Sequence, residues 1–417
     1  MSDVIVIGAG MAGLSAALRL RQAGRSVTLL TKGIGGIQLG QGTVDVLGYM
    51  PGRVENPLNA LERFTAENPE HPYALLGREA VAAGVNWLAE TLGPDHLVGD
   101  ANQNQLYPTA VGAMRPTALV PPSMAAGAIT PESRFVIVGI RQLKDFYPQL
   151  VAENLARTDL ADGGRIQVRH ASVSFPARRG EADPTGLTMA RTLDDPEARR
   201  RLVALLKPLV QPGETVGLPA VLGANDLNAW RDISEQLGAP VFEIPLPPPS
   251  VPGWRQNEAL VNLVKQARVR FVNGTSAVSA QLEGDRVLGV TIAGTGRPVT
   301  YTANHFVLAT GGFESGSLVL DSYNELHESL FGLPVRGGTI DSLVHGDYWG
   351  GDQPLFKAGL AVDERMRVTR PEGGVIHPNL YAAGAILAGA QRWSEKSGEA
   401  IALASALRAA DSILEEN

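Results

Sequence analysis

The chain has 417 residues, of which 44% are hydrophobic and 47 are glycine, and its formal net charge is −7. This length and composition predict a globular α/β protein of two or three domains, and the acidic balance without a Lys/Arg block argues against a nucleic-acid partner. Because the sequence contains no cysteine, disulfides, cysteine-ligated iron–sulfur clusters and cysteine zinc sites are excluded, and no metal site is expected.

The N-terminal segment has the pattern of a nucleotide-binding strand–helix–strand unit. An apolar strand leads into Gly8, Gly10 and Gly13, which have the G-x-G-x-x-G spacing, and an alanine-rich amphipathic helix follows. Such glycines allow a tight turn and let the backbone approach a pyrophosphate at the helix N-terminus. The second strand ends in Thr31 and Lys32 instead of the acidic residue that binds an adenosine ribose. This substitution weakens an NAD interpretation more than a flavin interpretation.

Further elements follow in chain order. A second strand–helix–strand unit is predicted at 134–175, and its single Gly139 is no phosphate fingerprint. The proline-rich run 245–253 is the strongest predicted boundary, because consecutive prolines continue neither helix nor sheet. The other predicted elements are a short helix at 59–64, a turn into a helix at 71–77, a helix at 227–238 between the segment 214–223 and a strand at 240–245, a helix at 257–267, a strand at 268–274 and a hairpin-rich sheet at 277–312.

Two later strands also end in glycine. "FVLATGG" closes on Gly311 and Gly312, and "NLYAAG" closes on Gly384. The turn 394–398 then opens a long helix, and it is either a site that stabilises negative charge on a flavin or an ordinary helix cap. The predicted cofactor-binding residues are Gly8, Gly10, Met11, Ala12, Gly13, Thr31, Lys32, Gly33, Gln41, Gly42, Thr310, Gly311, Gly312, Gly384, Ala385 and Gly398.

These segments, in this order, resemble the flavoproteins with two dinucleotide-binding domains. In the flavoprotein subunits of succinate dehydrogenase and fumarate reductase and in L-aspartate oxidase, the second strand likewise ends in Ser/Thr-Lys before a loop with a Gln-Gly pair. Thr31-Lys32 and Gln41-Gly42 are similar to that variant. The resemblance implies an α/β fold, a Rossmann-like FAD/NAD(P)-binding flavoprotein with an inserted second α/β domain. In it, the Thr31 hydroxyl can bind a ribose and Lys32 favours a phosphate.

A closer resemblance extends over nearly the whole chain. "GQGTVDVLGYMP", "HPYALLG", "LPPPSVPGWRQNEAL" and "NLYAAGAILAG" resemble the family of B subunits of bacterial anaerobic glycerol-3-phosphate dehydrogenases. The resemblance implies a flavoprotein that contains FMN and works with a catalytic A subunit and an iron–sulfur, membrane-bound C subunit. The assembly oxidises sn-glycerol 3-phosphate to dihydroxyacetone phosphate and passes electrons to quinone. The motifs themselves leave FAD and FMN equally open. This sequence departs from the family in lacking its occasional cysteines and in having Gln41-Gly42-Thr43 where serines are common.

The expected domains are discontinuous. The flavin-binding domain is expected to comprise 1–50, 253–316 and 356–417. The second domain, for substrate or partner, is expected to comprise 51–252 and 317–355.

Substrate-side residues are less clearly marked. Arg115, Arg255 and Arg336 are flanked by Gly or Pro and are predicted to lie in loops, where a guanidinium can bind a phosphate. His345 is a candidate base for the hydroxyl proton of an alcohol. Solvated arginines and a structural histidine are the alternatives, and no catalytic residue is assigned.

Two functions stay open. In the first, the chain relays electrons through its flavin from the A subunit to iron–sulfur clusters, and the scattered catalytic candidates favour this function. In the second, it is a stand-alone flavin-dependent oxidoreductase that oxidises glycerol 3-phosphate or another small substrate in its own pocket, similar to fumarate reductase or L-aspartate oxidase. The start of the chain has no signal-peptide pattern, and no apolar run approaches the ~20 residues of a membrane helix. A cytoplasmic chain is therefore expected, peripheral on the inner face of the cell membrane through its partners.

Overall fold

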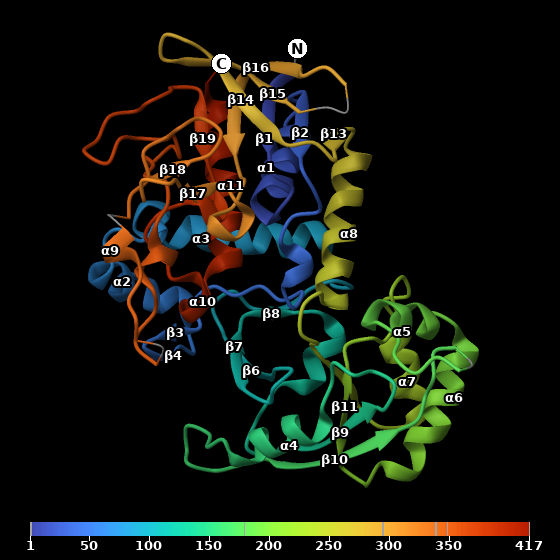
Figure 1. Ribbon diagram of the computed structural model, residues 1–417. Coiled ribbons are helices and arrows are strands. Elements are labelled where there is room, and N and C mark those ends of the chain that lie inside the picture. The colour runs from blue at the N-terminus through green and yellow to red at the C-terminus, as the bar shows by residue number, and fades with distance from the viewer. Residues whose placement is uncertain (1, 179, 294–295, 338–339, 348, 417) are drawn as a thin grey trace. The chain divides into compact units, whose positions relative to one another are not determined.

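The computed structural model describes residues 2–178, 180–293, 296–337, 340–347 and 349–416 (Figure 1). The chain packs into two compact units. The first consists of Met1–Gly36, Asp45–Leu88 and Ala259–Asn417, and the second consists of Ile37–Val44 and Ala89–Glu258.

A seven-stranded sheet forms the centre of the first unit (Figure 1). Its order is β13-β2-β1-β16-β15-β14, and β19 also pairs with β16. The strands β13, β2, β1, β16 and β19 are parallel, and β15 runs antiparallel to its two neighbours. The bounds are β1 Ser2–Ile7, β2 Val27–Thr31, β13 Arg270–Asn273, β14 Ala277–Glu283, β15 Arg286–Ile292, β16 Val299–Leu308 and β19 Leu380–Ala382.

The turn from β1 into helix α1 (Met11–Gln22) depends on two glycines. Gly8 has a φ of +111°, and a Cβ on it would overlap the carbonyl oxygen of Ala309. A Cβ on Gly13 would overlap the carbonyl oxygen of Gly8. Only glycine allows β1, α1 and the end of β16 to approach this closely.

Helix α11 (Gly398–Glu415) packs beside α1, as Figure 1 shows. An ion pair of 2.8 Å between Arg19 and Asp411 joins the two helices. The remaining elements of this unit are β3 Tyr49–Met50, β4 Gly52–Arg53, α2 Pro57–Glu67, η4 Phe313–Ser315, β17 Leu318–Leu320, β18 Leu326–Glu328, α9 Ile340–Leu343, η5 Pro354–Lys357, η6 Gly384–Ile386 and α10 Arg392–Glu395, with parts of α3 Pro72–Leu92 and α8 Val251–Gln266.

A four-stranded parallel sheet of order β10-β9-β11-β12 forms the second unit. Helix α4 connects β9 to β10, which confirms the second strand–helix–strand unit. The bounds are η1 Ile37–Leu39, β5 Val98–Gly99, β6 Gln105–Pro108, β7 Met114–Thr117, β8 Leu119–Val120, η2 Pro122–Gly127, β9 Arg134–Ile140, α4 Pro148–Arg157, β10 Gln167–Val173, α5 Gly186–Leu193, α6 Pro196–Leu206, η3 Lys207–Leu209, β11 Thr215–Pro219, α7 Ala229–Leu237 and β12 Val241–Ile244.

The two units depart from the division expected from the sequence. Residues 51–88 and 317–355 pack with the first unit, whereas 37–44 packs with the second. The reason for the first difference is visible in α3, where a Cβ on Gly84 would lie 2.8 Å from the backbone nitrogen of Ala404 in α11. The proline run is not the boundary, because the chain passes between the units inside α8, after Glu258.

A buried ion pair joins β12 to α8 in the second unit. The Glu243 side chain is fully buried, and its Oε2 lies 2.7 Å from Nη1 of Arg255. The same carboxylate accepts hydrogen bonds from the Ser123 hydroxyl at 2.6 Å and the backbone N–H of Leu222 at 2.7 Å. Arg255 also donates to the carbonyl oxygen of Gly223. Both charges are therefore compensated, as burial requires.

We expect Glu243→Ala to lower the free energy of unfolding by about 3–5 kcal/mol, because it leaves the Arg255 charge buried without its partner. The matched control is Glu197→Ala, which breaks an exposed ion pair with Arg200 and should cost less than ~1 kcal/mol. Urea denaturation followed by circular dichroism measures both changes. Equal losses in the two variants would contradict the assigned role of Glu243.

Candidate functional site

The glycine-rich segments of the first unit follow neighbouring parallel strands. The strands β1, β2, β16 and β19 end at Ile7, Thr31, Leu308 and Ala382. Because parallel strands end at one edge of the sheet, the segments that follow them lie together there. This edge is where α/β sheets bind ligands.

Gly10 differs from the packed glycines beside it. It is the N-cap residue of α1, and no side chain caps the helix. A Cβ on Gly10 would meet no atom within 4 Å. The first turn of α1 carries no acidic residue. A helix N-terminus without a side-chain cap or an acidic first turn can bind a phosphate through its N–H groups and positive dipole end.

Gly384 brings β19 and α11 to the same place. A Cβ on Gly384 would lie 2.8 Å from the Cβ of Ala12 in α1 and 3.9 Å from that of Ala402 in α11. Its backbone N–H donates a 2.9 Å hydrogen bond to the Ser405 hydroxyl in α11. The predicted residues Gly384, Ala385 and Gly398 are thus carried by elements that pack around the start of α1.

The segment after β16 holds a buried hydroxyl oxygen. The Oγ1 atom of Thr310 is buried and has no hydrogen-bond partner among the described residues. The carbonyl oxygen of Thr310 accepts a 2.7 Å hydrogen bond from Ser317, and Gly311 has a φ of +82°. A buried polar atom without a partner at this edge fits a bound group that supplies the missing hydrogen bond.

The loop after β2 differs in one respect from expectation. The Thr31 hydroxyl donates to the carbonyl oxygen of Gly33 at 2.6 Å, so its hydrogen is used within the loop and is not offered to a ribose. The physical reason is that Thr31 is buried beneath the turn, where its hydroxyl needs a local acceptor. Lys32 and Gly33 are exposed, and Lys32 keeps the charge that would favour a phosphate.

The sequence analysis missed an arginine beside a recess in the first unit. Phe313, Glu314, Phe356 and Trp393 line this recess, which has a volume of about 600 Å³. Arg392 lies next to it and forms a 2.9 Å ion pair with Glu314. Its Nη2 atom lies 3.6 Å from the position of a Cβ on Gly312. The only sequence signal was its place two residues before the turn 394–398.

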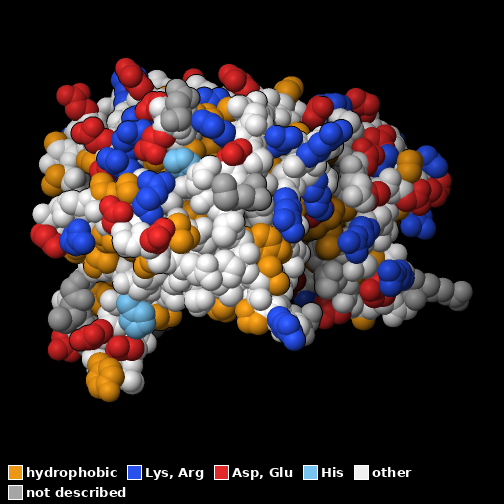
Figure 2. All heavy atoms as spheres, turned by 90° about the horizontal axis from the view of Figure 1, so that it is seen from above, with side chains coloured by type: hydrophobic (Ala, Val, Ile, Leu, Met, Phe, Trp, Pro, Cys, Tyr) orange, Lys and Arg blue, Asp and Glu red, His pale blue; other side chains and the backbone are white. Residues whose placement is uncertain are grey.

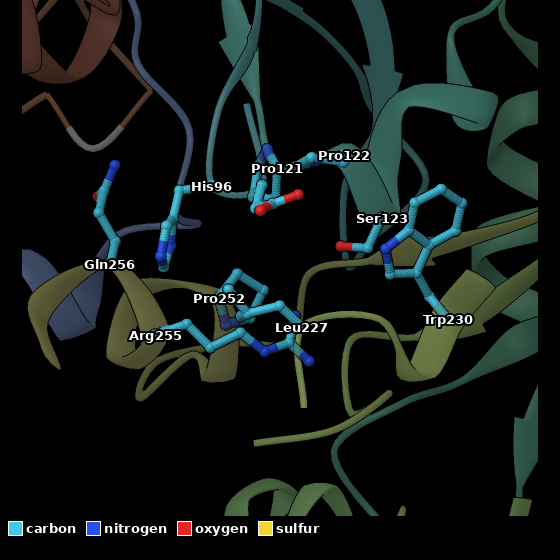
Figure 3. A pocket seen from close by; sticks show the side chains of 11 residues that line it. His96, Pro121, Pro122, Ser123, Leu227, Trp230, Pro252, Arg255 and Gln256 are labelled. Carbon is cyan, nitrogen blue, oxygen red and sulfur yellow. The ribbon is translucent and has the colours of Figure 1, made fainter. Parts of the chain in front are cut away.

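The predicted Gln41 and Gly42 belong to the second unit. Gly42 contributes to a cavity of about 20 Å³, which is lined also by His96, Ser123, Arg255 and seven further residues (Figure 3). Burial lowers the pKa of His96, which favours its neutral form. A cavity of this volume holds about one water molecule and no substrate.

The four substrate-side candidates do not converge. Arg115 lies in strand β7 and Arg255 in helix α8, so their prediction as loop residues was wrong. Both belong to the second unit, and the Arg255 guanidinium is bonded to Glu243 and Gly223. In the first unit, Arg336 lies 3.6 Å from Glu70, and the exposed ring of His345 lies 3.0 Å from the carbonyl oxygen of Gly351. Flanking glycines and prolines did not reveal these tertiary pairings.

We expect Gly10→Glu to abolish flavin binding while the protein still folds. The backbone at Gly10 has a φ of −80°, which any residue adopts, and the added carboxylate would occupy the space of a phosphate with the wrong charge. Gly8→Ala is the contrasting variant, because its Cβ would overlap Ala309 and should prevent folding. Circular dichroism checks the fold, and release of flavin by denaturation checks the cofactor. A folded Gly10→Glu protein with stoichiometric flavin would contradict this site.

A second prediction concerns Lys32. Lys32→Glu should weaken flavin affinity by about 1 kcal/mol, the value of a charge-assisted hydrogen bond reduced by solvent exposure. Lys32→Met is the neutral control and should lose less. Titration of the apo-protein with FAD and with FMN measures the effect for a pyrophosphate and for a monophosphate. Equal affinities in all three proteins would show that Lys32 contacts no cofactor phosphate.

Comparison with known proteins gives matches over the whole chain. The family described as FAD binding domain matches residues 3–401. The B subunit of the anaerobic glycerol-3-phosphate dehydrogenase of Actinobacillus pleuropneumoniae is 29% identical over 430 residues, which cover 99% of this chain and 98% of that protein. The protein of the same name from Pectobacterium carotovorum is 31% identical over 423 residues, which cover 99% of this chain and 99% of that protein. A probable B subunit of the same dehydrogenase from Halobacterium salinarum is 31% identical over 97% of this chain and 95% of its own length.

Solved structures that align with this chain share little sequence with it. The 3-ketosteroid Δ1-dehydrogenase from Sterolibacterium denitrificans has a TM-score of 0.47 and 13% identity, with 100% of both chains covered. The open conformation of a flavocytochrome c3 fumarate reductase has a TM-score of 0.47 and 14% identity, covering 99% of this chain and 78% of that chain.

The family match confirms the predicted α/β flavoprotein fold and the flavin cofactor, and the family's description names FAD. The edge described above fits such a cofactor, since it presents an uncapped helix N-terminus and a buried oxygen without a partner among the described residues. The match over residues 3–401, together with 31% identity to a relative along nearly its full length, shows that this chain belongs to the FAD binding domain family, among the B subunits of anaerobic glycerol-3-phosphate dehydrogenases.

Proposed function

We propose that this chain is the flavin-containing B subunit of a dehydrogenase that oxidises sn-glycerol 3-phosphate to dihydroxyacetone phosphate and passes electrons to quinone. The observation that carries the proposal is the end-to-end match with proteins of that name, at 29–31% identity. The glycine-rich strand ends support it from the structure, because they offer a dinucleotide site in the first unit.

We assign FAD binding to the first unit. The N-terminus of α1 at Gly10 would hold the pyrophosphate, the Thr310 hydroxyl would bind the cofactor near the end of β16, and Gly398 at the start of α11 would face the flavin ring. A bound flavin supplies the ability to accept a hydride and to give up electrons singly. The chain contributes binding, orientation and the positive ends of two helices.

We infer an electron-relay role. The four substrate-side candidates are divided between the units, and Arg255 is held by Glu243. The sequence has no cysteine to ligate an iron–sulfur cluster. Among the described residues, no helix is both long enough and apolar enough to cross a bilayer. Electrons on the flavin therefore need a partner to reach a quinone.

The partners that suit this role are a catalytic A subunit and an iron–sulfur, membrane-bound C subunit, which would place this chain at the inner face of the membrane. Basic and acidic side chains are interspersed on the face shown in Figure 2. Mixed charge of this kind suits docking to proteins better than binding to a nucleic-acid backbone.

One observation favours the second candidate, a stand-alone oxidoreductase. Arg392 borders the recess lined by Phe313, Phe356 and Trp393, and its planar guanidinium could bind the anionic group of a small substrate. Anaerobic addition of glycerol 3-phosphate to the isolated chain separates the two candidates. A relay protein keeps its flavin oxidised, whereas bleaching of the flavin would favour the stand-alone enzyme.

We expect quinone reduction only in the complete assembly. The chain would be assayed alone, with the A subunit and with both partners, first with a soluble dye and then with quinone in membranes. The reason is that the sequence has no cysteine to ligate an iron–sulfur cluster, and no helix among the described residues could carry electrons into a bilayer toward a lipid-soluble acceptor. Rapid quinone turnover by the chain alone would refute the relay role.

A further inference from the structure

The aromatic recess of the first unit has the size and the lining of a ligand site. Phe313 and Glu314 follow strand β16, Phe356 lies in η5 and Trp393 lies in α10, and these four residues line a volume of about 600 Å³. Pockets that bind small molecules have volumes of roughly 300–1,000 Å³ and are lined mainly by apolar and aromatic side chains. Phe356 and Trp393 are exposed although they are large and apolar, which is typical of side chains that a ligand covers.

Gly312 connects the recess to the edge of the sheet that offers the dinucleotide site. A Cβ on Gly312 would lie 3.0 Å from Oε2 of Glu314 and 3.6 Å from Nη2 of Arg392. The carbonyl oxygen of Ala385, which follows β19, would lie 3.2 Å from the same position. Because glycine leaves room for all three groups, the segments after β16 and β19 meet α10 beside the recess.

Arg392 is the cation at this place. Its side chain is 15% exposed, whereas that of its partner Glu314 is 45% exposed. Among the described residues, its guanidinium makes one hydrogen bond, from Nη2 to Oε1 of Glu314 at 2.9 Å. A guanidinium has five N–H donors in a planar fork. Arg392 therefore keeps donors for an anion, which can bind without displacing Glu314.

The charges at the recess favour an anionic ligand over a cationic one. Glu314 by itself would attract a cation, but the more buried Arg392 compensates its charge. A guanidinium that is largely out of water binds a carboxylate more strongly than an exposed one, because water screens the attraction less. The aromatic lining adds a preference for flat rings, which pack on aromatic side chains in offset or edge-to-face contacts.

We propose that this recess binds a small molecule that combines a planar aromatic ring with a carboxylate. The ring packs among the three aromatic side chains, and the carboxylate binds the remaining N–H groups of Arg392. Glu314 weakens the affinity, because its charge repels the carboxylate of the ligand. This site goes beyond the proposed function, since it does not depend on which molecule reduces the flavin.

Three probes test the ligand class by calorimetric titration of the flavin-loaded, full-length chain. The first is 2-naphthoate. 2-Naphthamide carries the same ring without the charge, and decahydro-2-naphthoate carries the charge on a saturated form of the same carbon skeleton. We expect each of these two to bind about tenfold more weakly than 2-naphthoate, because each lacks one of the recognised features. Equal affinities for all three probes overturn the proposed ligand class.

Two substitutions of the ion pair should change the affinity for 2-naphthoate in opposite directions. Arg392→Gln should weaken binding about tenfold, the loss expected for one charge-assisted hydrogen bond. Glu314→Gln should strengthen binding about threefold, because it removes the repulsion and keeps an acceptor for Arg392. Disturbed packing would weaken binding in both variants. Arg200→Gln breaks an exposed ion pair with Glu197 and is the matched control, with the affinity of the wild type.

Trp393→Ala tests the aromatic lining. It should weaken 2-naphthoate binding about tenfold and leave the fold intact, because the indole is 61% exposed. Thermal melts check the fold of every variant. Wild-type affinity in both Arg392→Gln and Trp393→Ala overturns the inference, as does binding of 2-naphthoate to the flavin-free chain alone, which would make the recess a part of the cofactor site. The proposed function is overturned by a different result, a folded chain that binds no flavin.

Discussion

The close approach of three backbone segments at Gly8 and Gly13 is the constraint on which the first unit depends. Any Cβ at these positions would overlap the carbonyl oxygens of Ala309 or Gly8. Because glycine carries a hydrogen where other residues carry a Cβ, β1, α1 and the end of β16 can pack closely together. The N-terminus of α1 therefore lies at the edge of the sheet where these strands end. A Cβ on Gly10, between these two glycines, would meet no atom within 4 Å.

Helix α11 completes this arrangement from the other end of the chain. Gly384 lets β19 approach both Ala12 in α1 and Ala402 in α11, so the starts of two helices are gathered around one strand end. Neither helix has a side-chain cap. At α1 the cap residue is a glycine, whereas at α11 it is Ser397, whose hydroxyl is bonded to Glu395. The N-terminus of α1 suits an anionic cofactor, whereas at α11 the Ala400 N–H donates to the carbonyl oxygen of Asp45 and Glu399 places an acidic side chain in the first turn.

The ion pair of Arg255 in the second unit and that of Arg392 in the first unit differ in their burial. In the second unit, Glu243 and Arg255 satisfy each other inside the fold, and this pairing removes Arg255 from recognition of a ligand. In the first unit, Arg392 lies beside an open aromatic recess and is held by the more exposed Glu314. Burial and partners, which composition does not reveal, separate a structural arginine from one that can meet a ligand.

By itself the sequence determined the elements and the chemistry of local turns: the spacing of Gly8, Gly10 and Gly13, the apolar strands and the glycines at Gly312 and Gly384 predicted a flavin-binding α/β fold. These features can be predicted from the sequence because each depends on residues that are close together in the chain. Only the tertiary structure decided that 51–88 packs with the first unit and that Arg19 in α1 pairs with Asp411 in α11. Those contacts depend on where the chain returns after hundreds of residues, and no local periodicity carries that distance.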